Sequence, residues 1–456
     1  MPKRPAITFP ADFIWGAATA SYQIEGAHDA HGKGRSIWDE FVERPGVIEG
    51  GDHARRACDH YSLFETDVAL MKEIGLKAYR FSLAWTRLLP NGVGASNPDG
   101  IDFYNRLIDA LLEAGIEPCP TLFHWDLPQA LQDKGGWASA EIADWFADYT
   151  ELATRAYGDR IKTWFTLNEP NVFASAGHVL GLHAPGLQDP AAYLKCIHHQ
   201  NLAHGRAVEV FRNTVPDGRI GIVINMGLFE GESGSGEDAT AAETVDALYN
   251  KAHLDPILKG SYPLPVRTLM EGFGVSIDER AVKTISQRTD FLGVNFYSRR
   301  KIAADPSAPL GACPVEETGD GSENLTAMGW RVDPEGFYLS LKRLHDEYAV
   351  PIIVTENGVA YEDQVEMTNG QKTIQDPERI AFFQDYLRAL DRALQDGVNI
   401  SGYFAWSLLD NFEWAEGYRP RFGLIHVDFE TLERTPKESA RWFRRLIDAN
   451  TLAATE

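Results

Sequence analysis

The chain has 456 residues, of which 44% are hydrophobic and 24% charged, so it can fold around a large buried core. Its formal net charge of −23 repels the phosphates of nucleic acids and of anionic membrane surfaces, which argues against both as partners. No run of about 18 apolar residues indicates a transmembrane helix, and the N-terminus lacks the apolar region of a signal peptide, so we expect a cytoplasmic location.

Short apolar segments alternate with amphipathic stretches along the whole chain. The segments are apolar up to their last two or three residues, as in strands buried on both faces of a parallel sheet. We predict strands at residues 13–19, 78–85, 117–125, 163–169, 219–226, 291–297, 351–357 and 400–409. Helical spacing predicts helices at residues 61–74, 103–113, 142–157, 194–213, 336–348, 380–394 and 438–447. This alternation indicates an α/β fold, a (β/α)8 TIM barrel that forms one domain over residues 1–456.

Three long irregular segments, at residues 30–57, 171–189 and 301–331, each follow a predicted strand closely. Loops after strands build the active-site face of a barrel, so we expect these segments to wall a cleft. The alternative is that they are peripheral decorations or linkers. The polar stretch at residues 231–238 is predicted to be a flexible loop.

The four cysteines are scattered and do not have the spacing of a disulfide framework or of a zinc site. We expect reduced thiols at Cys58, Cys119, Cys196 and Cys313. No glycine-rich phosphate loop follows a strand, which argues against a nucleotide cofactor. The sequence therefore predicts neither a metal nor an organic cofactor.

Polar and aromatic side chains gather at the carboxyl ends of the predicted strands. A barrel brings these ends into one ring, so the side chains are expected to meet in one cleft. They are Gln23, Arg80, His124, Trp125, Asn168, Glu169, Asn295, Tyr297, Glu356, Trp406, Glu413 and Trp414. Carboxylates, amides and aromatic rings together are typical of a carbohydrate site.

Each of these residues also has an alternative interpretation. A lone glutamate at a strand end is most often a solvated or salt-bridged surface group. Arg80 is equally compatible with a structural ion pair, and His124 with a core histidine. Glu169 and Glu356 differ from surface glutamates because each ends an apolar run and is followed by Pro or by Asn-Gly, which force a sharp exit.

The strings around these residues make the sequence similar to glycoside hydrolase family 1, the family of β-glucosidases and β-galactosidases. They are FIWGAATASYQIEG, RFSLAWTRLLP, TLFHWDLP, TLNEPNVF, FLGVNFYS, IIVTENG, GYFAWSLLDNFEWAEGY and RFGLIHVDF. The resemblance covers nearly the whole chain, and the pairing of TLNEP with TENG is highly specific to this group. It implies a retaining barrel enzyme that cleaves β-glycosides.

The resemblance implies a role for each matching position. Glu169 matches the general acid/base and Glu356 the nucleophile, while Tyr297 and Arg80 match a phenol and a guanidinium beside the nucleophile. The implied substrate-binding residues are Gln23, His124, Trp125, Asn168, Asn295 (near the nucleophile), Trp330 (on the aglycone side), Trp406 (beneath the sugar), Glu413, Trp414 and Phe422. Val172 and Phe173 are expected to help set aglycone preference.

The chemistry that follows needs two carboxyl groups with different pKa values. Glu356 attacks the anomeric carbon while protonated Glu169 donates to the leaving oxygen, and Glu169 then deprotonates the water that releases the sugar. Arg80 and Tyr297 are expected to favour ionised Glu356, and burial and the charge of Glu356 to raise the pKa of Glu169.

The sequence therefore predicts an exo-acting β-glucosidase that hydrolyses cellobiose, short cello-oligosaccharides and aryl or alkyl β-glucosides. The alternatives are an enzyme that prefers β-galactosides or β-fucosides, a transglycosylase, and a non-catalytic sugar-binding barrel. Phospho-glycosidases of the family lack the pair Glu413-Trp414, which is present here, although Arg419 leaves a phosphate role open. The predicted partners are small neutral sugars, and a homo-oligomer is possible.

Overall fold

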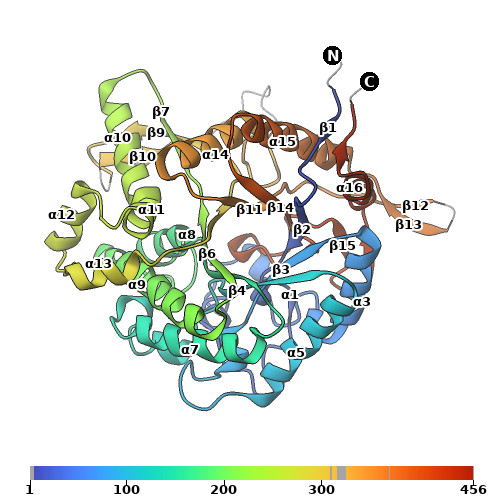
Figure 1. Cartoon of the computed structure of the whole chain (residues 1–456), viewed down its shortest axis with the longest axis horizontal. Coiled ribbons are helices and arrows are strands. Elements are labelled where there is room, and N and C mark those ends of the chain that lie inside the picture. Colours follow the sequence, from blue (N-terminus) through green and yellow to red (C-terminus); the bar gives the residue numbers. More distant parts are fainter. Residues whose placement is uncertain (1–4, 309–310, 316–324, 369, 455–456) are drawn as a thin grey trace.

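The computed structural model describes residues 5–308, 311–315, 325–368 and 370–454. Parallel strands close into an eight-stranded barrel in the order β11-β14-β2-β3-β4-β5-β6-β8 (Figure 1). They are β2 (Ile14–Ala18), β3 (Ala78–Ser82), β4 (Glu117–Phe123), β5 (Thr163–Asn168), β6 (Arg219–Asn225), β8 (Phe291–Asn295), β11 (Ile352–Asn357) and β14 (Ile400–Trp406). The predicted barrel is confirmed, and each predicted strand overlaps one of these.

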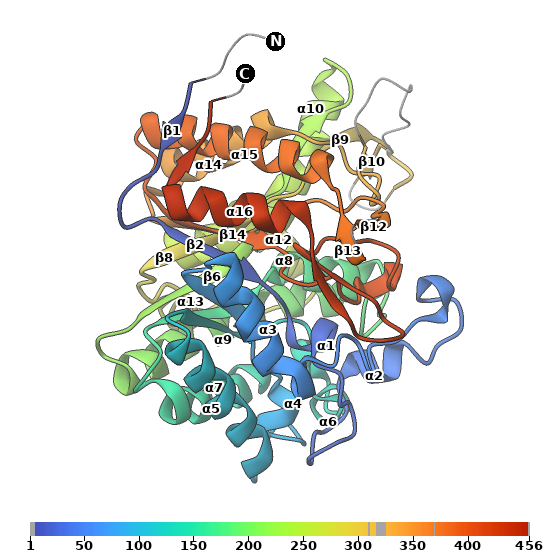
Figure 2. The same cartoon turned by 90° about the vertical axis from the view of Figure 1, so that its right-hand side faces the viewer.

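Helices surround the barrel, and all seven predicted helices are present (Figures 1 and 2). They are α3 (His60–Ile74), α5 (Pro98–Glu113), α7 (Ile142–Tyr157), α9 (Pro190–Thr214), α14 (Pro334–Tyr348), α15 (Pro377–Gln395) and α16 (Glu438–Ala449). Four of them begin at a proline, several residues before the predicted start. Proline suits the first helical position, where an N–H has no partner, but apolar spacing does not reveal that turn.

The region after β6 departs from the prediction, because residues 231–238 are not simply a flexible loop. They join β7 (Leu228–Gly231) to the helix α10 (Gly236–Asp246), whose N-terminus is capped by the Ser235 hydroxyl. The Asp238 carboxylate accepts from the backbone N–H of Ala304 at 2.8 Å. The helices α11 (Ala252–Leu258), α12 (Leu264–Gly272) and α13 (Glu279–Ile285) were also not predicted.

The three long segments predicted to be irregular contain short elements of their own. Segment 30–57 contains α2 (Ile37–Phe41), and segment 171–189 continues α8 (Pro170–Ala174) through a π-helical turn. In segment 301–331, β9 (Arg299–Ala304) and β10 (Ala312–Pro314) form a sheet with β7. Residues 316–324 of that segment lie outside the described residues.

The remaining short elements lie outside the eight-stranded barrel, and six of them form three two-stranded sheets. The described chain ends lie side by side, where β1 pairs with β17 (Figures 1 and 2). These elements are β1 (Ile7–Thr8), α1 (Ser21–Ile24), α4 (Trp85–Leu88), α6 (Gln129–Gln132), β12 (Val365–Thr368), β13 (Gln371–Ile374), β15 (Ile425–Val427), β16 (Arg434–Pro436) and β17 (Thr451–Leu452).

Large side chains fill the barrel interior where neighbouring strands carry glycine. A Cβ atom at Gly16 would lie 2.4 Å from the Phe404 ring, and one at Gly221 would lie 2.5 Å from the Phe291 ring. These glycines therefore make room for the aromatic rings that pack the barrel. Above them the Arg80 guanidinium lies over the Phe165 ring at 5.3 Å and marks the change from apolar core to polar site.

All four cysteines are free, as predicted. Among the described helices, none is long and apolar enough to cross a membrane. The residues that the structure describes contain no cluster of three or more metal-ligating side chains.

Candidate active site

A pocket of about 280 Å³ lies at the carboxyl ends of the barrel strands. Ten of the predicted site residues line it, namely Glu169, Glu356, Tyr297, His124, Trp125, Trp330, Trp406, Glu413, Trp414 and Phe422. The other four are buried and make hydrogen bonds to members of that set or to each other, and they are Arg80, Gln23, Asn168 and Asn295. The fold thus brings together all the residues that were predicted to form one site.

The Glu356 carboxylate ends strand β11 between a cation and a phenol. Arg80 Nη1 donates to Glu356 Oε1 at 2.6 Å, and the Tyr297 hydroxyl donates to Oε2 at 2.7 Å. Burial raises the pKa of Glu356 above its ordinary value, while Arg80 and Tyr297 oppose that rise by stabilising the ionised form. Both carboxylate oxygens therefore have a charged or polar donor that favours the anion.

The Glu169 carboxyl has a different environment. Its residue has φ of 44°, a left-handed conformation that turns the chain sharply from β5 into α8 at Pro170. Asn295 Nδ2 and Asn225 Nδ2 donate to Glu169 Oε1 at 2.8 and 2.9 Å. Burial, together with the charge of Glu356, raises the pKa of Glu169 to about 8, so this carboxyl carries a proton at neutral pH.

Asn295 lies beside the nucleophile Glu356, where it was expected, and it also reaches Glu169. Its hydrogen bonds go to Glu169 Oε1 and, at 3.2 Å, to Asn168 Oδ1, although it also interacts with Glu356. Its own Oδ1 accepts from the Thr355 hydroxyl at 2.6 Å, which fixes the orientation of the amide. Asn295 therefore bridges the two carboxyl groups, a position that the spacing of the motif did not reveal.

His124 is held as a neutral imidazole. Burial and the nearby Arg80 charge lower the pKa of His124 well below its ordinary value. Asn168 Nδ2 lies 2.9 Å from His124 Nε2, and because an amide nitrogen only donates, Nε2 accepts and the ring proton sits on Nδ1. His124 Nδ1 is buried with no hydrogen-bond partner among the described residues. This N–H is therefore available to a sugar hydroxyl.

Gln23 and Glu413 form a second polar corner. Gln23 Nε2 donates to the Phe412 carbonyl at 2.8 Å and to Glu413 Oε2 at 3.4 Å, while Gln23 Oε1 is buried without a partner among the described residues. Burial, then the charges of Glu416 and Glu356, raise the pKa of Glu413 well above its ordinary value. The Gln23 amide oxygen, an acceptor, and the Glu413 carboxyl group thus lie side by side.

Aromatic rings supply the apolar surfaces of the pocket. The His124 ring stacks on Trp406 at 6.0 Å, and Trp125 packs against Trp414 at 4.7 Å. Trp330 also lines the pocket and lies 5.1 Å from Tyr297. Aromatic rings can pack against the apolar face of a sugar ring, and the polar groups beside them can bind its hydroxyls.

Two of the three long segments wall the pocket, as predicted. Segment 171–189 contributes Leu182 and His183, and segment 301–331 contributes Met328. Segment 30–57 does not line this pocket, and its Trp38 instead packs behind Trp414 at 4.5 Å.

One further expectation is wrong, and one alternative interpretation is disfavoured. Val172 lines the pocket, but Phe173 is buried and packs against Phe123 at 5.3 Å, so it cannot contact an aglycone directly. Arg419 is bound by Glu49 at 2.9 Å and by the Ala327 carbonyl at 2.8 Å, outside the set of lining residues. This pairing disfavours the phosphate role that the sequence left open.

The sequence interpretation missed several lining residues, among them Asn225, Tyr249 and Arg300. Asn225 ends β6, so the rule applied to the other strand ends would have identified it. Tyr249 lies in a helical region that was not predicted, and Arg300 lies in β9, a strand that was not predicted.

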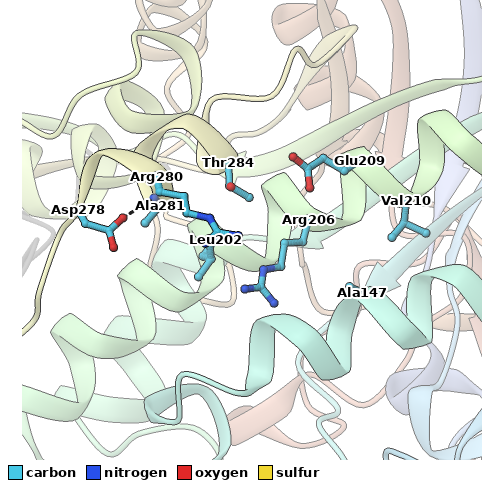
Figure 3. Close-up of a pocket in the computed structure, with 9 residues that line it drawn as sticks. All are labelled: Ala147, Leu202, Arg206, Glu209, Val210, Asp278, Arg280, Ala281 and Thr284. Carbon is cyan, nitrogen blue, oxygen red and sulfur yellow. Dashed lines mark hydrogen bonds between the residues drawn. The ribbon is translucent and has the colours of Figure 1, made fainter.

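A second hollow, of about 570 Å³, lies between the outer helices α7, α9 and α13 (Figure 3). Its side chains are mainly aliphatic and charged, including Arg206, Glu209 and Arg280, and it contains no aromatic ring and none of the strand-end residues. It therefore lacks the surfaces expected of a sugar site.

A (β/α)8 barrel with two buried glutamates facing an aromatic pocket is the arrangement of a glycosidase. The chain belongs to glycosyl hydrolase family 1, whose sequence model matches residues 6–452. This confirms the resemblance seen in the motifs.

The chain is similar over its full length to several known family members. It is 48% identical to beta-glucosidase A of Acetivibrio thermocellus, covering 97% of this chain and 99% of that protein. It is 46% identical to 1,4-beta-D-glucan glucohydrolase of Thermotoga neapolitana, over 97% and 99% of the two chains. The solved family 1 b-glucosidase of Thermotoga maritima superposes with a TM-score of 0.93 at 45% identity, over 98% and 99% of the chains.

Proposed function

We propose that this protein is a retaining exo-β-glucosidase that removes terminal nonreducing glucosyl residues from short cello-oligosaccharides and from aryl or alkyl β-glucosides. The observation that carries the proposal is the unequal pair of carboxyl groups. Glu356 is held by Arg80 and Tyr297. Glu169 is buried, has no cation as a direct partner among the described residues, and has a pKa of about 8. The names of the similar proteins support glucose as the sugar.

The reaction follows from these two environments. A Glu356 oxygen attacks the anomeric carbon, the bond to the leaving oxygen breaks, and Glu169 gives its proton to that oxygen. Glu356 loses its negative charge when it bonds to the sugar. The repulsion that helped to raise the pKa of Glu169 is then removed. Ionised Glu169 then takes a proton from water, whose oxygen attacks the anomeric carbon and releases Glu356.

Recognition of the sugar rests on three polar groups, two of which lack a hydrogen-bond partner among the described residues. His124 Nδ1–H offers a donor and Gln23 Oε1 an acceptor, while the Glu413 carboxyl can accept from two neighbouring hydroxyls. Trp406 provides an apolar surface at the same end of the pocket. These groups match the hydroxyl-bearing edge of a neutral hexose, and two-point binding by Glu413 tolerates a change of configuration at one hydroxyl.

A panel of aryl glycosides tests the proposed sugar preference. We expect kcat/KM to be highest for the β-glucoside, lower for the β-fucoside and β-galactoside, and lowest for the β-mannoside and 6-phospho-β-glucoside. Arg419 supports the last expectation because Glu49 and Ala327 already bind it. Preference for the phosphorylated sugar, or no activity toward any member, would refute the proposal. Product analysis at high substrate concentration separates hydrolysis from transglycosylation.

We expect kcat/KM to have a bell-shaped dependence on pH, with the alkaline limb near pH 8. The reactive free enzyme needs ionised Glu356 and protonated Glu169, so activity falls as pH rises through the Glu169 pKa of about 8. The measurement is kcat/KM for an alkyl β-glucoside against pH. A limb that persists unchanged in Glu169→Gln, measured with an activated aryl glucoside, would assign it to another group.

We further propose that the whole chain works as a single glycosidase domain. The family match from residue 6 to residue 452 supports this, as does the pairing of β1 with β17 at the two ends.

A further inference from the structure

The end of strand β6 is attached to the Glu169 turn by three hydrogen bonds. The Glu169 backbone N–H donates to the Val223 carbonyl at 2.8 Å, and Asn171 Nδ2 donates to the Asn225 carbonyl at 2.7 Å. The third bond runs from Asn225 Nδ2 to Glu169 Oε1 at 2.9 Å. The backbone on both sides of this side-chain contact is therefore fixed, so the Asn225 amide has a defined position relative to the carboxyl group.

Glu169 Oε1 receives two amide donors, Asn225 at 2.9 Å and Asn295 at 2.8 Å. A carboxyl oxygen has two lone pairs, so two N–H donors occupy Oε1 and leave no room for a proton there. The acidic proton of Glu169 must then sit on Oε2. The Asn295 amide also donates to Asn168 Oδ1 at 3.2 Å, whereas Glu169 Oε1 is the acceptor found for the Asn225 amide.

We propose that Asn225 is a positioning residue that holds Glu169 Oε1, so that Oε2 alone carries the proton to the leaving oxygen and later takes the proton of water. This inference rests on the proposed glycosidase function and adds a residue to it. Asn225 acts through Glu169, and its role covers both steps of the reaction.

The Asn225 hydrogen bond favours the ionised form of Glu169, which acts as the base, over the protonated form, which acts as the acid. The amide N–H stabilises the carboxylate, so it opposes the rise in the Glu169 pKa that burial and Glu356 cause. Removing it should raise that pKa further. The enzyme would then keep its acid to higher pH but would lose part of the ionised base that hydrolyses the glycosyl-enzyme.

Asn225 also lines the pocket beside Tyr249 and Trp330, so a competing explanation is that it only contacts the aglycone. The two roles separate in the second step of the reaction. The aglycone has left before water attacks the glycosyl-enzyme, and an aglycone contact therefore cannot affect that step.

The test uses Asn225→Ala and Asn225→Asp with 2,4-dinitrophenyl β-glucoside, whose kcat reports hydrolysis of the glycosyl-enzyme. Rates are expressed per active site, counted from the initial burst of dinitrophenolate, so unfolded protein does not contribute. We expect kcat near neutral pH to fall by about tenfold in Asn225→Ala, and further in Asn225→Asp because a second negative charge faces Glu169. For an alkyl β-glucoside, the alkaline limb of kcat/KM should move up by about half a pH unit or more in both variants.

Val172→Ala is the matched control, because it alters the same pocket without a polar contact. It should change KM for different aglycones and leave the alkaline limb in place. If the Asn225 variants behave like this control, with wild-type hydrolysis of the glycosyl-enzyme, the positioning role is overturned. Wild-type protein that cleaves no aryl β-glucoside would instead overturn the proposed function.

Discussion

Glu356→Gly should lower kcat for aryl β-glucosides by a factor on the order of 10⁵ to 10⁶, as expected when a catalytic nucleophile is removed. Without the carboxylate no covalent intermediate forms, and Arg80 and Tyr297 lose the group to which they donate. Azide is small and anionic, so it should enter the vacated space and attack an activated aryl glucoside from the same face. The product expected is the α-glucosyl azide, with inverted configuration.

The measurement is steady-state kinetics with and without azide, followed by determination of the product's anomeric configuration. Glu151→Gln on α7 serves as a control, since this half-buried glutamate pairs with Arg155 on the protein surface. Near-normal turnover in Glu356→Gly would contradict the assignment of the nucleophile. Rescue by azide with retained configuration would place the nucleophile elsewhere.

Glu169→Gln should have an effect that depends on the leaving group. For alkyl β-glucosides, whose leaving oxygen needs a proton, we expect kcat/KM to fall by about 10²–10⁴-fold. For 2,4-dinitrophenyl β-glucoside, whose leaving group departs without a proton, kcat/KM should change little. Its kcat should still fall, because the same residue acts as the base for water.

The amide keeps the size of the Glu169 side chain, so the comparison isolates the proton from the shape of the pocket. In Glu169→Ala, azide should accelerate release of the sugar as the β-glucosyl azide, since it attacks the glycosyl-enzyme from the opposite face to Glu356. An equal loss of kcat/KM for both leaving groups would show that Glu169 has a binding or structural role only.

The barrel could be predicted from the sequence because each strand combines a buried run with a polar end. The region 232–285 could not, since helices such as α10 carry few apolar residues at regular spacing. Their positions depend on contacts with residues that are distant in the sequence, such as the hydrogen bond from the Ala304 N–H to Asp238. Helix starts were also missed where a proline precedes the first apolar residue, as at Pro190.

The residues of the candidate site could be predicted from the motifs, but the contacts between their side chains could not. The strings around Glu169 and Glu356 identify the residues, and they do not show that Asn295 reaches Glu169 or that Phe173 turns into the core. Side-chain direction beyond a strand end is set by packing from other strands and loops. Asn225 was the one site residue that the strand-end rule could have added.

In the proposed mechanism, Glu356 forms the covalent bond to the sugar. A direct test is to inactivate the wild-type enzyme with 2,4-dinitrophenyl 2-deoxy-2-fluoro-β-glucoside, digest it, and locate the label by mass spectrometry. We expect one 2-deoxy-2-fluoroglucosyl group per chain, attached to Glu356 in the sequence PIIVTENG. A label on Glu169, Glu413 or any other residue, or complete release of dinitrophenolate without a trapped intermediate, would contradict it.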